Sequence, residues 1–401
     1  MIGIVLFIVA GAAAVLLICG TWAAAALWRA EPDQPPAAWS PDPTTKSALL
    51  RFWDGQAWTS AVAPAGAPTG RGRLFWGRFW GWWALVYGGG VAVTLAGSVL
   101  YLNGGSVPVF ALTSAVAMSV LFAAFGWFVA RQLNLAEVVT VWQVVAAVIA
   151  GAGASILIAG NINDLISHLF GVKTALATVG IVEESTKLLV PLVLYALVRY
   201  RNPRAGIAVG LASAAGFGIA EATSYAIVMP HGTAVNPCSP AMVSTTSPDV
   251  TVGSEFFRLL TVEPLHLFWT GIAVAVVWRL WRHYGRARVT PAVVGAVLLP
   301  MALHSSFDST SDFACGNNPG LDALLGLLKV LLFIASYLLF KFFVSQSTPP
   351  DIVASVSSGW HPSHLKSASP GVRDPAGNSG TEPAAKATPD SDSGNHTSAT
   401  P

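Results

Sequence analysis

Three charged side chains lie in the middle of an apolar stretch that is long enough to cross a lipid bilayer. The stretch covers residues 174 to 198, and it carries Glu183, Glu184 and Lys187. On a helix the lysine is four residues from Glu183 and three from Glu184, so the three side chains share one face. A charge at the bilayer centre costs about 3 kcal/mol on insertion scales, so this group requires partners, water or both. It is either a self-neutralising ion pair that helps helices associate or part of a chemical site.

Later apolar stretches carry further carboxylates and imidazoles. Those of interest here, in chain order, are Glu221, Glu263, His266, His304 and Asp308. His304 and Asp308 are four residues apart and would share a helix face. Imidazoles and carboxylates together can form either a divalent metal site or a metal-free general base with an oxyanion partner.

The elements that must position these groups are membrane spans. The chain is 53% hydrophobic and only 10% charged, and its mean hydropathy of +0.59 excludes an ordinary soluble domain. The pattern predicts an all-α, polytopic transmembrane helical bundle of about nine spans. These are residues 2 to 28, 79 to 101, 109 to 130, 138 to 160, 174 to 198, 205 to 229, 259 to 280, 289 to 310 and 321 to 344.

The placement of lysine and arginine predicts the orientation of the chain. If the first span begins outside, the cytoplasmic connections hold the basic residues of 29 to 78, Arg131, 199 to 204 and 279 to 288. The external connections then hold only Lys173 and Arg258. This asymmetry predicts a multi-pass protein of the plasma membrane with its N-terminus outside and its C-terminus inside.

With that topology the polar groups of four spans meet at one depth. At a rise of about 1.5 Å per residue, Glu183, Glu221, His266 and His304 lie roughly 14, 12, 10 and 9 Å from the outer ends of their spans. Separate structural ion pairs would not need a common depth. Interhelical hydrogen bonding remains a sufficient explanation for any one of these residues alone.

Two external segments carry further polar residues and cysteines. Residues 161 to 172 are predicted to be a short amphipathic external segment, with Asp164 and His168 as surface residues. Cys238 and Cys315 fall in two different external loops. Because that side of the membrane is oxidising, we expect a disulfide between them, with two free thiols as the alternative.

The terminal segments have a different character from the spans. Residues 1 to 28 lack a positive n-region and are too long for a signal peptide, so they are predicted to be a retained anchor. Residues 38 to 60, AWSPDPTTKSALLRFWDGQAWTS, are rich in turns and aromatic residues around a small RFW strand. Residues 345 to 401 are rich in Ser, Pro, Thr, Ala and Gly and are expected to be a disordered cytoplasmic tail.

The ordered polar motifs of the spans resemble those of a known family. They are Glu183-Glu184-x-x-Lys187, Phe217-x-x-x-Glu221, His266 near the start of its helix, and His304-x-x-x-Asp308. This order resembles the PrsW family of intramembrane proteases, which is related to the type II CAAX prenyl endopeptidases. The resemblance covers about residues 140 to 345, within a membrane-embedded protease domain of residues 79 to 344. Residues 38 to 60 resemble a short Trp-rich actinobacterial module of the DUF2510 type, which implies a cytoplasmic accessory module and no chemistry.

The PrsW resemblance implies hydrolysis of a peptide bond in a single-pass membrane protein, near the extracytoplasmic end of that protein. In the better-known bacterial case the substrate is an anti-sigma factor. The expected partners are this substrate and the lipid bilayer, with no nucleic acid.

The expected roles within the site follow from the motifs. Glu183 or Glu184 would be the base. The ligands of a divalent metal, with zinc the first choice, would be Glu221, His266 and His304, which without metal would be oxyanion and water-positioning groups. Asp308 would orient His304, and Lys187 would keep the neighbouring glutamate ionised.

Two other functions use the same residue types. A proton-coupled transporter also places Glu and His chains in helices, but it favours inverted repeats, and none is visible in the sequence. A catalytically inactive membrane scaffold usually lacks a motif residue, whereas all four motifs are intact here.

Overall fold

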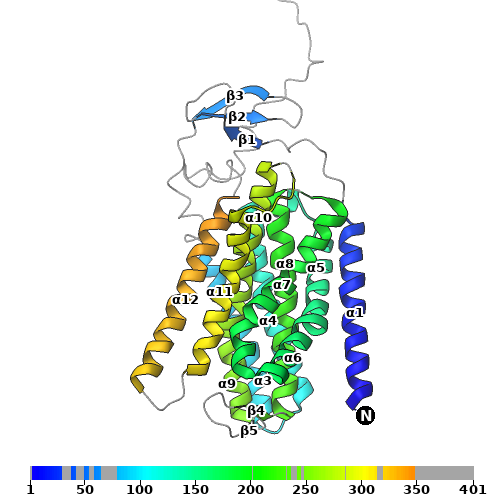
Figure 1. The fold of residues 1–401 in the computed structure, drawn as a ribbon, viewed down its shortest axis with the longest axis vertical. Helices are drawn as coiled ribbons and strands as arrows, with labels where there is room; N and C mark the ends of the chain where they lie inside the picture. The colour runs from blue at the N-terminus through cyan, green and yellow to red at the C-terminus, as the bar shows by residue number, and fades with distance from the viewer. Residues whose placement is uncertain are drawn as a thin grey trace, which may run out of the picture. The chain divides into compact units, whose positions relative to one another are not determined.

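The helices of the chain run side by side as a bundle (Figure 1). The computed structural model describes residues 2–28, 38–41, 49–53, 58–64, 79–200, 202–231, 233–235, 242–244, 248–284, 286–313 and 319–347. The helices are α1 (Ile2–Ala26), α3 (Phe79–Leu102), α4 (Val107–Leu133), α5 (Val141–Ala154), α6 (Gly160–Phe170), α7 (Val172–Val198), α8 (Pro203–Val228), α9 (Pro248–Phe257), α10 (Glu263–Tyr284), α11 (Pro291–Phe313) and α12 (Pro319–Ser345).

The strands of the described residues form two small antiparallel sheets. β1 (Ala38–Pro41), β2 (Leu49–Trp53) and β3 (Trp58–Pro64) form an antiparallel sheet in the order β1-β2-β3. β2 contains the RFW strand expected from the sequence. β4 (Thr233–Val235) and β5 (Met242–Ser244) form a second antiparallel pair.

The predicted fold class, an all-α polytopic membrane bundle, is confirmed. Within the described residues, seven helical segments are long and apolar enough to cross a bilayer. Two of the nine expected spans are helices that fall outside these seven. One is α3, in which the apolar stretch of Gly88–Leu102 is shorter than a membrane span requires. The other is α7, which is 27 residues long but carries the three charged residues of the central motif.

The helix of the expected span 138 to 160 does not end at residue 160. α5 continues through a π-helical turn, Ser155–Ala159, into α6, so one helical segment covers Val141–Phe170. Asn161 donates from Nδ2 to the carbonyl oxygens of Ile156 and Leu157, which satisfies backbone groups of the widened turn. Most of the residues expected to form a short amphipathic external segment are therefore an extension of this helix. Asp164 and His168 lie on it as an exposed pair 3.4 Å apart, as predicted.

The expected external loop 230 to 258 is also too long. α9 starts at Pro248 and continues through a second π-helical turn, Arg258–Val262, into α10. Pro264 supplies the physical reason, since it lacks an N–H group and its ring crowds the carbonyl four residues earlier. A wider turn relieves that crowding without ending the helix. Arg258, expected in a loop, is thereby buried within a helix.

Small residues let α8 pass close to its neighbours. A Cβ atom added at Gly216 would lie 1.9 Å from the carbonyl oxygen of Val148 on α5, and one added at Gly151 would lie 2.2 Å from that of Ser213. Close backbone approach of this kind is how helices pack tightly in membranes. Ser213 also donates to the carbonyl oxygen of Lys187, which ties α8 to the centre of α7.

Two predictions fall on residues outside the described ranges. Cys238 and Cys315 lie outside them, so their disulfide stays a prediction. Most of the segment 345 to 401 also lies outside, beyond the end of α12 at Ser345.

Candidate active site

A cavity of about 320 Å³ opens beside the charged centre of α7. Its apolar wall comes largely from one face of α7, and from α9 and the π-helical turn that follows it. Those residues are Val172, Ala175, Leu176, Val179, Phe257 and Val262. The polar residues of its lining are Asn163, Glu183, Glu221, Tyr225, Ser254, Arg258, His304, Asp308 and Lys329. Polar groups from several helices therefore face one space.

All seven residues singled out from the sequence lie in or directly behind this wall. Four of them line the cavity: Glu183, Glu221, His304 and Asp308. The other three, Glu184, Lys187 and His266, are buried next to them and connected to them by hydrogen bonds or ion pairs. Charged groups in this setting are expensive unless each has close partners, and here each has at least one.

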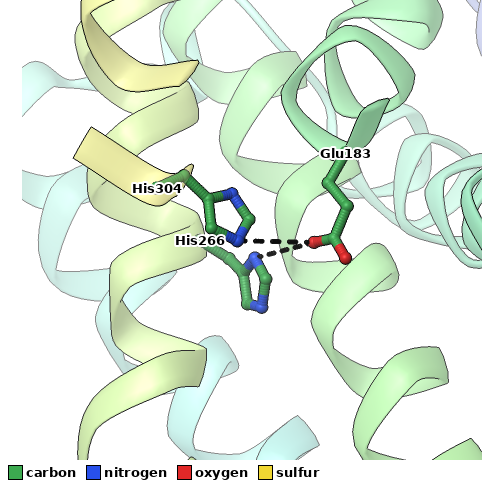
Figure 2. Close-up of side chains that lie close together, drawn as sticks. All are labelled: Glu183, His266 and His304. Atoms are coloured by element: carbon green, nitrogen blue, oxygen red, sulfur yellow. Dashed lines mark ion pairs between the residues drawn. The ribbon is translucent and has the colours of Figure 1, made fainter. Parts of the chain in front are cut away.

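Glu183 of α7, His266 of α10 and His304 of α11 converge on one another (Figure 2). Glu183 Oε2 lies 3.7 Å from His304 Nε2 and 4.0 Å from His266 Nδ1. Ligand atoms held about 2.0 to 2.2 Å from one ion lie roughly 3 to 4 Å apart, so this trio has the spacing of a metal site. All three residues are buried.

Glu184 fixes the orientation of His304. Its Oε1 lies 3.0 Å from His304 Nδ1 and accepts a 2.7 Å hydrogen bond from Lys187 Nζ. Its Oε2 accepts from Thr270 at 2.9 Å. The indole ring of Trp269 stacks on the His304 ring with a centroid distance of 4.1 Å. One carboxylate oxygen, Glu184 Oε1, and the stacked Trp269 ring thus hold the imidazole so that Nε2 faces Glu183.

Asp308 does not take the Nδ1 position that an orienting partner of His304 would occupy. Its Oδ2 lies 3.4 Å from His304 Nε2, on the same side of the ring as Glu183, and its side chain is 23% exposed. The structure therefore brings Asp308 to the cavity, where a reacting molecule could meet it.

Lys187 is the cation at the centre of this group. Its Nζ lies 3.4 Å from Glu183 Oε2, contacts His266 Nδ1 and lies 4.4 Å from the centroid of the Phe217 ring. The side chain is fully buried. Its charge offsets part of the negative charge of the two adjacent glutamates.

A second group surrounds the other nitrogen of His266. Glu221 Oε2 lies 3.1 Å and Glu263 Oε2 3.8 Å from His266 Nε2. Arg258 Nη2 lies 2.9 Å from Glu221 Oε1 and 2.8 Å from Glu263 Oε1. Glu221, Glu263 and His266 are the second set of three residues with metal-ligand spacing in the described part of the chain.

The three residues expected to bind the metal are divided between two groups. His266 belongs to both groups, His304 lies in the group with Glu183, and Glu221 lies in the group with Glu263. Sequence reasoning gave Glu263 no role, although it is three residues before His266 and so on the same helix face. It placed Arg258 in an external loop, because a helix that continues through a π-helical turn has no simple sequence signal.

Asn163 is a further polar residue that sequence reasoning missed. It lies on α6, lines the cavity and donates from Nδ2 to Glu183 Oε1 at 3.2 Å. Glu183 Oε2 is thereby left to face the two imidazoles. Nothing in the sequence indicated this contact, because residues 161 to 172 were expected to lie outside the helix bundle.

Comparisons with known proteins identify the family of the chain. No curated protein and no solved structure matches the chain. Residues 37–71 match a family described as a protein of unknown function, DUF2510. Residues 139–340, half of the chain, match the family described as PrsW family intramembrane metalloprotease, and this match contains every residue of both metal-ligand groups. The chain therefore belongs to the PrsW family of intramembrane metalloproteases and is a membrane-embedded peptidase.

Proposed function

We propose that the protein hydrolyses a peptide bond in a single-pass membrane protein, near the extracytoplasmic end of its transmembrane helix. The observation that carries the proposal is the trio Glu183, His266 and His304 beside a cavity of about 320 Å³. Two of its members line that cavity, so a substrate could reach them. A site of three protein ligands with one open side is the pattern of catalytic zinc.

The residues present fit a zinc ion. Two imidazole nitrogens and one carboxylate oxygen are one of the donor sets of catalytic zinc, and His304 has the carboxylate partner on its other nitrogen that zinc-bound histidines usually have. Ligation through His266 Nδ1 requires Lys187 Nζ to release that atom, while its 2.7 Å hydrogen bond to Glu184 can remain. When bound, the ion supplies Lewis-acid polarisation of the scissile carbonyl and acidifies the attacking water.

The other residues of the site orient groups and move a proton. Glu184 holds His304, and Lys187 holds Glu184 in place. Asp308 is the group that accepts a proton from the attacking water. Glu184 cannot do so because it is 1% exposed and hydrogen-bonded through both oxygens, and Glu221 is paired with Arg258. Asp308 faces the cavity, within reach of a water molecule beside His304.

The proposed orientation in the plasma membrane is N-terminus outside and C-terminus inside, on the asymmetry of lysine and arginine. Glu183 is the twelfth residue of α7, about 16 Å from the start of that helix at Val172. With α7 starting outside, the site lies in the outer half of the membrane. A substrate such as an anti-sigma factor, which has one span and an external domain, would present its outer helix end at this depth.

The proposed reaction predicts where the cut falls. Purified full-length protein, loaded with zinc in liposomes, should cleave single-pass proteins, and mass spectrometry of the fragments should place the new ends in the outer half of the substrate span. Fragments that also appear with Glu183→Gln protein would come from a contaminant. Cuts confined to the cytoplasmic half of the span would contradict the proposal.

The orientation predicts opposite labelling at the two ends of α7. Lys173 and Arg199 are exposed and lie at those ends. In a variant without native cysteines, an impermeant maleimide should label Lys173→Cys in intact cells and Arg199→Cys only after lysis. Labelling of Arg199→Cys in intact cells would show that the proposed orientation in the membrane is wrong. It would not contradict the proposed peptide-bond hydrolysis.

A further inference from the structure

We propose that Glu221, Glu263 and His266 form a second divalent-cation site, directly behind the first, with His266 shared between the two. The first site would use Nδ1 of the ring and the second Nε2. The second site rests on atoms of its own and does not depend on which substrate the enzyme cleaves.

The primary observation is a set of three buried atoms without hydrogen-bond partners. Among the described residues, Glu221 Oε2, Glu263 Oε2 and His266 Nε2 are all buried and all lack a hydrogen bond. Glu221 Oε2 and His266 Nε2 lie 3.1 Å apart without the alignment of one. A buried polar atom without a partner is costly and rare, so three that face one another need a common explanation.

The spacing of the three atoms suits one ion. Glu221 and Glu263 present Oε2 at 3.1 and 3.8 Å from His266 Nε2, and all three atoms lie within 4.8 Å of one another. Ligand atoms about 2.0 to 2.2 Å from a shared ion have separations of roughly 3 to 4 Å. Two carboxylates and one imidazole suit a divalent transition metal such as zinc.

Arg258 holds both carboxylates in the ligating orientation. Its Nη2 lies within 2.9 Å of Glu221 Oε1 and within 2.8 Å of Glu263 Oε1, so the Oε2 atoms are turned toward His266. Partners of this kind around the ligands are typical of metal sites. Gly218 supplies room, because a Cβ atom there would lie 2.6 Å from Glu263 Oε2.

The charges around the second site leave a deficit that a divalent ion would fill. Three carboxylates, those of Glu221, Glu263 and Glu255, lie near Arg258, and Glu255 is fully buried with Oε2 on Ser114. One guanidinium balances one of the three. If all three are ionised, two negative charges then remain in a low-dielectric region, where uncompensated charge is expensive.

The alternative explanation is a proton shared between the two carboxylates. A protonated Glu263 would satisfy one oxygen of the pair and reduce the charge, and His266 Nε2 would then have only Glu221 Oε2, 3.1 Å away, as its partner. The two explanations differ in the number of metal ions bound per chain. If ions occupy both nitrogens of His266, the ring gives up its remaining proton to solvent as they bind.

The test is the zinc content of the purified full-length protein after dialysis against low zinc, measured by elemental mass spectrometry against protein concentration. We expect two zinc ions per chain in the wild type and one in Glu263→Gln. The surface variant Glu137→Gln should keep two. One ion per chain in the wild type, or an unchanged count in Glu263→Gln, would overturn the second site.

A second variant tests the same site if Glu263→Gln fails to fold. Gly218→Ala adds one methyl group against Glu263 Oε2, and we expect it to weaken binding of the second ion at least about tenfold while the first is kept. Zinc titration by calorimetry would then show two binding steps in the wild type and a weakened second step in the variant. Identical titrations would contradict the proposal. An active wild type with one zinc would leave the proposed function intact and remove only this inference.

Discussion

Cleavage and one bound zinc ion are expected to disappear together when Glu183 is replaced by glutamine or His304 by alanine. Each variant removes or neutralises one of three donor groups whose atoms lie within 4.8 Å of one another, with Glu183 Oε2 3.7 Å from His304 Nε2 and 4.0 Å from His266 Nδ1. The loss of activity should be on the order of 10⁴-fold or more, the scale seen when one member of a catalytic unit is removed. The measurements are fragment formation from a single-pass substrate and zinc per chain on the same preparation.

The double variant tests whether Glu183 and His304 act together as one unit or contribute to catalysis independently. Because either change alone already removes the ion, Glu183→Gln with His304→Ala should be little worse than either single variant. Losses that add up in the double variant would mean that the two residues act independently. Well-folded single variants that cut at the parental rate would show that the trio is structural.

Two exposed positions provide matched controls for charge and for imidazole loss. Glu137 pairs with Arg204 at the surface, and His168 pairs with Asp164 on α6. Glu137→Gln and His168→Ala should both cleave at close to the parental rate. A large loss in either would indicate that the assay reports general destabilisation.

The fold and most of the site residues were predictable from the sequence for one physical reason. Charged side chains are so costly in a bilayer that an apolar stretch tolerates them only for a purpose. Glu183, Glu184 and Lys187 were conspicuous on that ground alone, and His266 and His304 were conspicuous because they recur at one depth. The structure brings Glu183 and His304 to one cavity wall and buries the other three directly behind it.

The parts that were missed depend on details of backbone geometry. Arg258 and Asn163 enter the site because two helices continue through π-helical turns where the sequence predicted that they would stop. Such a turn changes the direction of every later side chain in the helix, and no residue pattern marks it. The spacing of residues in the sequence shows which of them share a helix face. It does not show how far one extra residue in a turn rotates the rest of the helix.

The partner of each imidazole was the least predictable feature. Spacing alone makes Asp308 the natural partner of His304, four residues away on the same helix. In the structure Glu184, on another helix, takes His304 Nδ1, and Asp308 lies at Nε2. The packing of α7 against α11 decides which of the two carboxylates reaches each ring nitrogen. The effects expected for variants of Glu184 and Asp308 depend on this arrangement.

Asp308→Asn is expected to lose cleavage while keeping its zinc. The amide has nearly the same size and can still hydrogen-bond near His304 Nε2, so the three donor atoms should stay in place. It cannot accept a proton from water at neutral pH. General-base catalysis contributes typically about 10²-fold to 10⁴-fold, and a loss in that range in kcat, with unchanged zinc content, is the expected result.

Glu184→Gln is the matched comparison, because it alters a carboxylate on the opposite side of the same imidazole. Glu184 Oε1 lies 3.0 Å from His304 Nδ1 and takes the Lys187 hydrogen bond, so its loss should act through the ring that it holds. Zinc affinity should fall by about 10-fold to 100-fold, and cleavage should recover as zinc is added. Asp308→Asn should not recover with zinc. If the two variants behave alike, with weaker zinc binding and rescue in both, Asp308 orients His304 as its spacing suggests, and the base must be another cavity carboxylate.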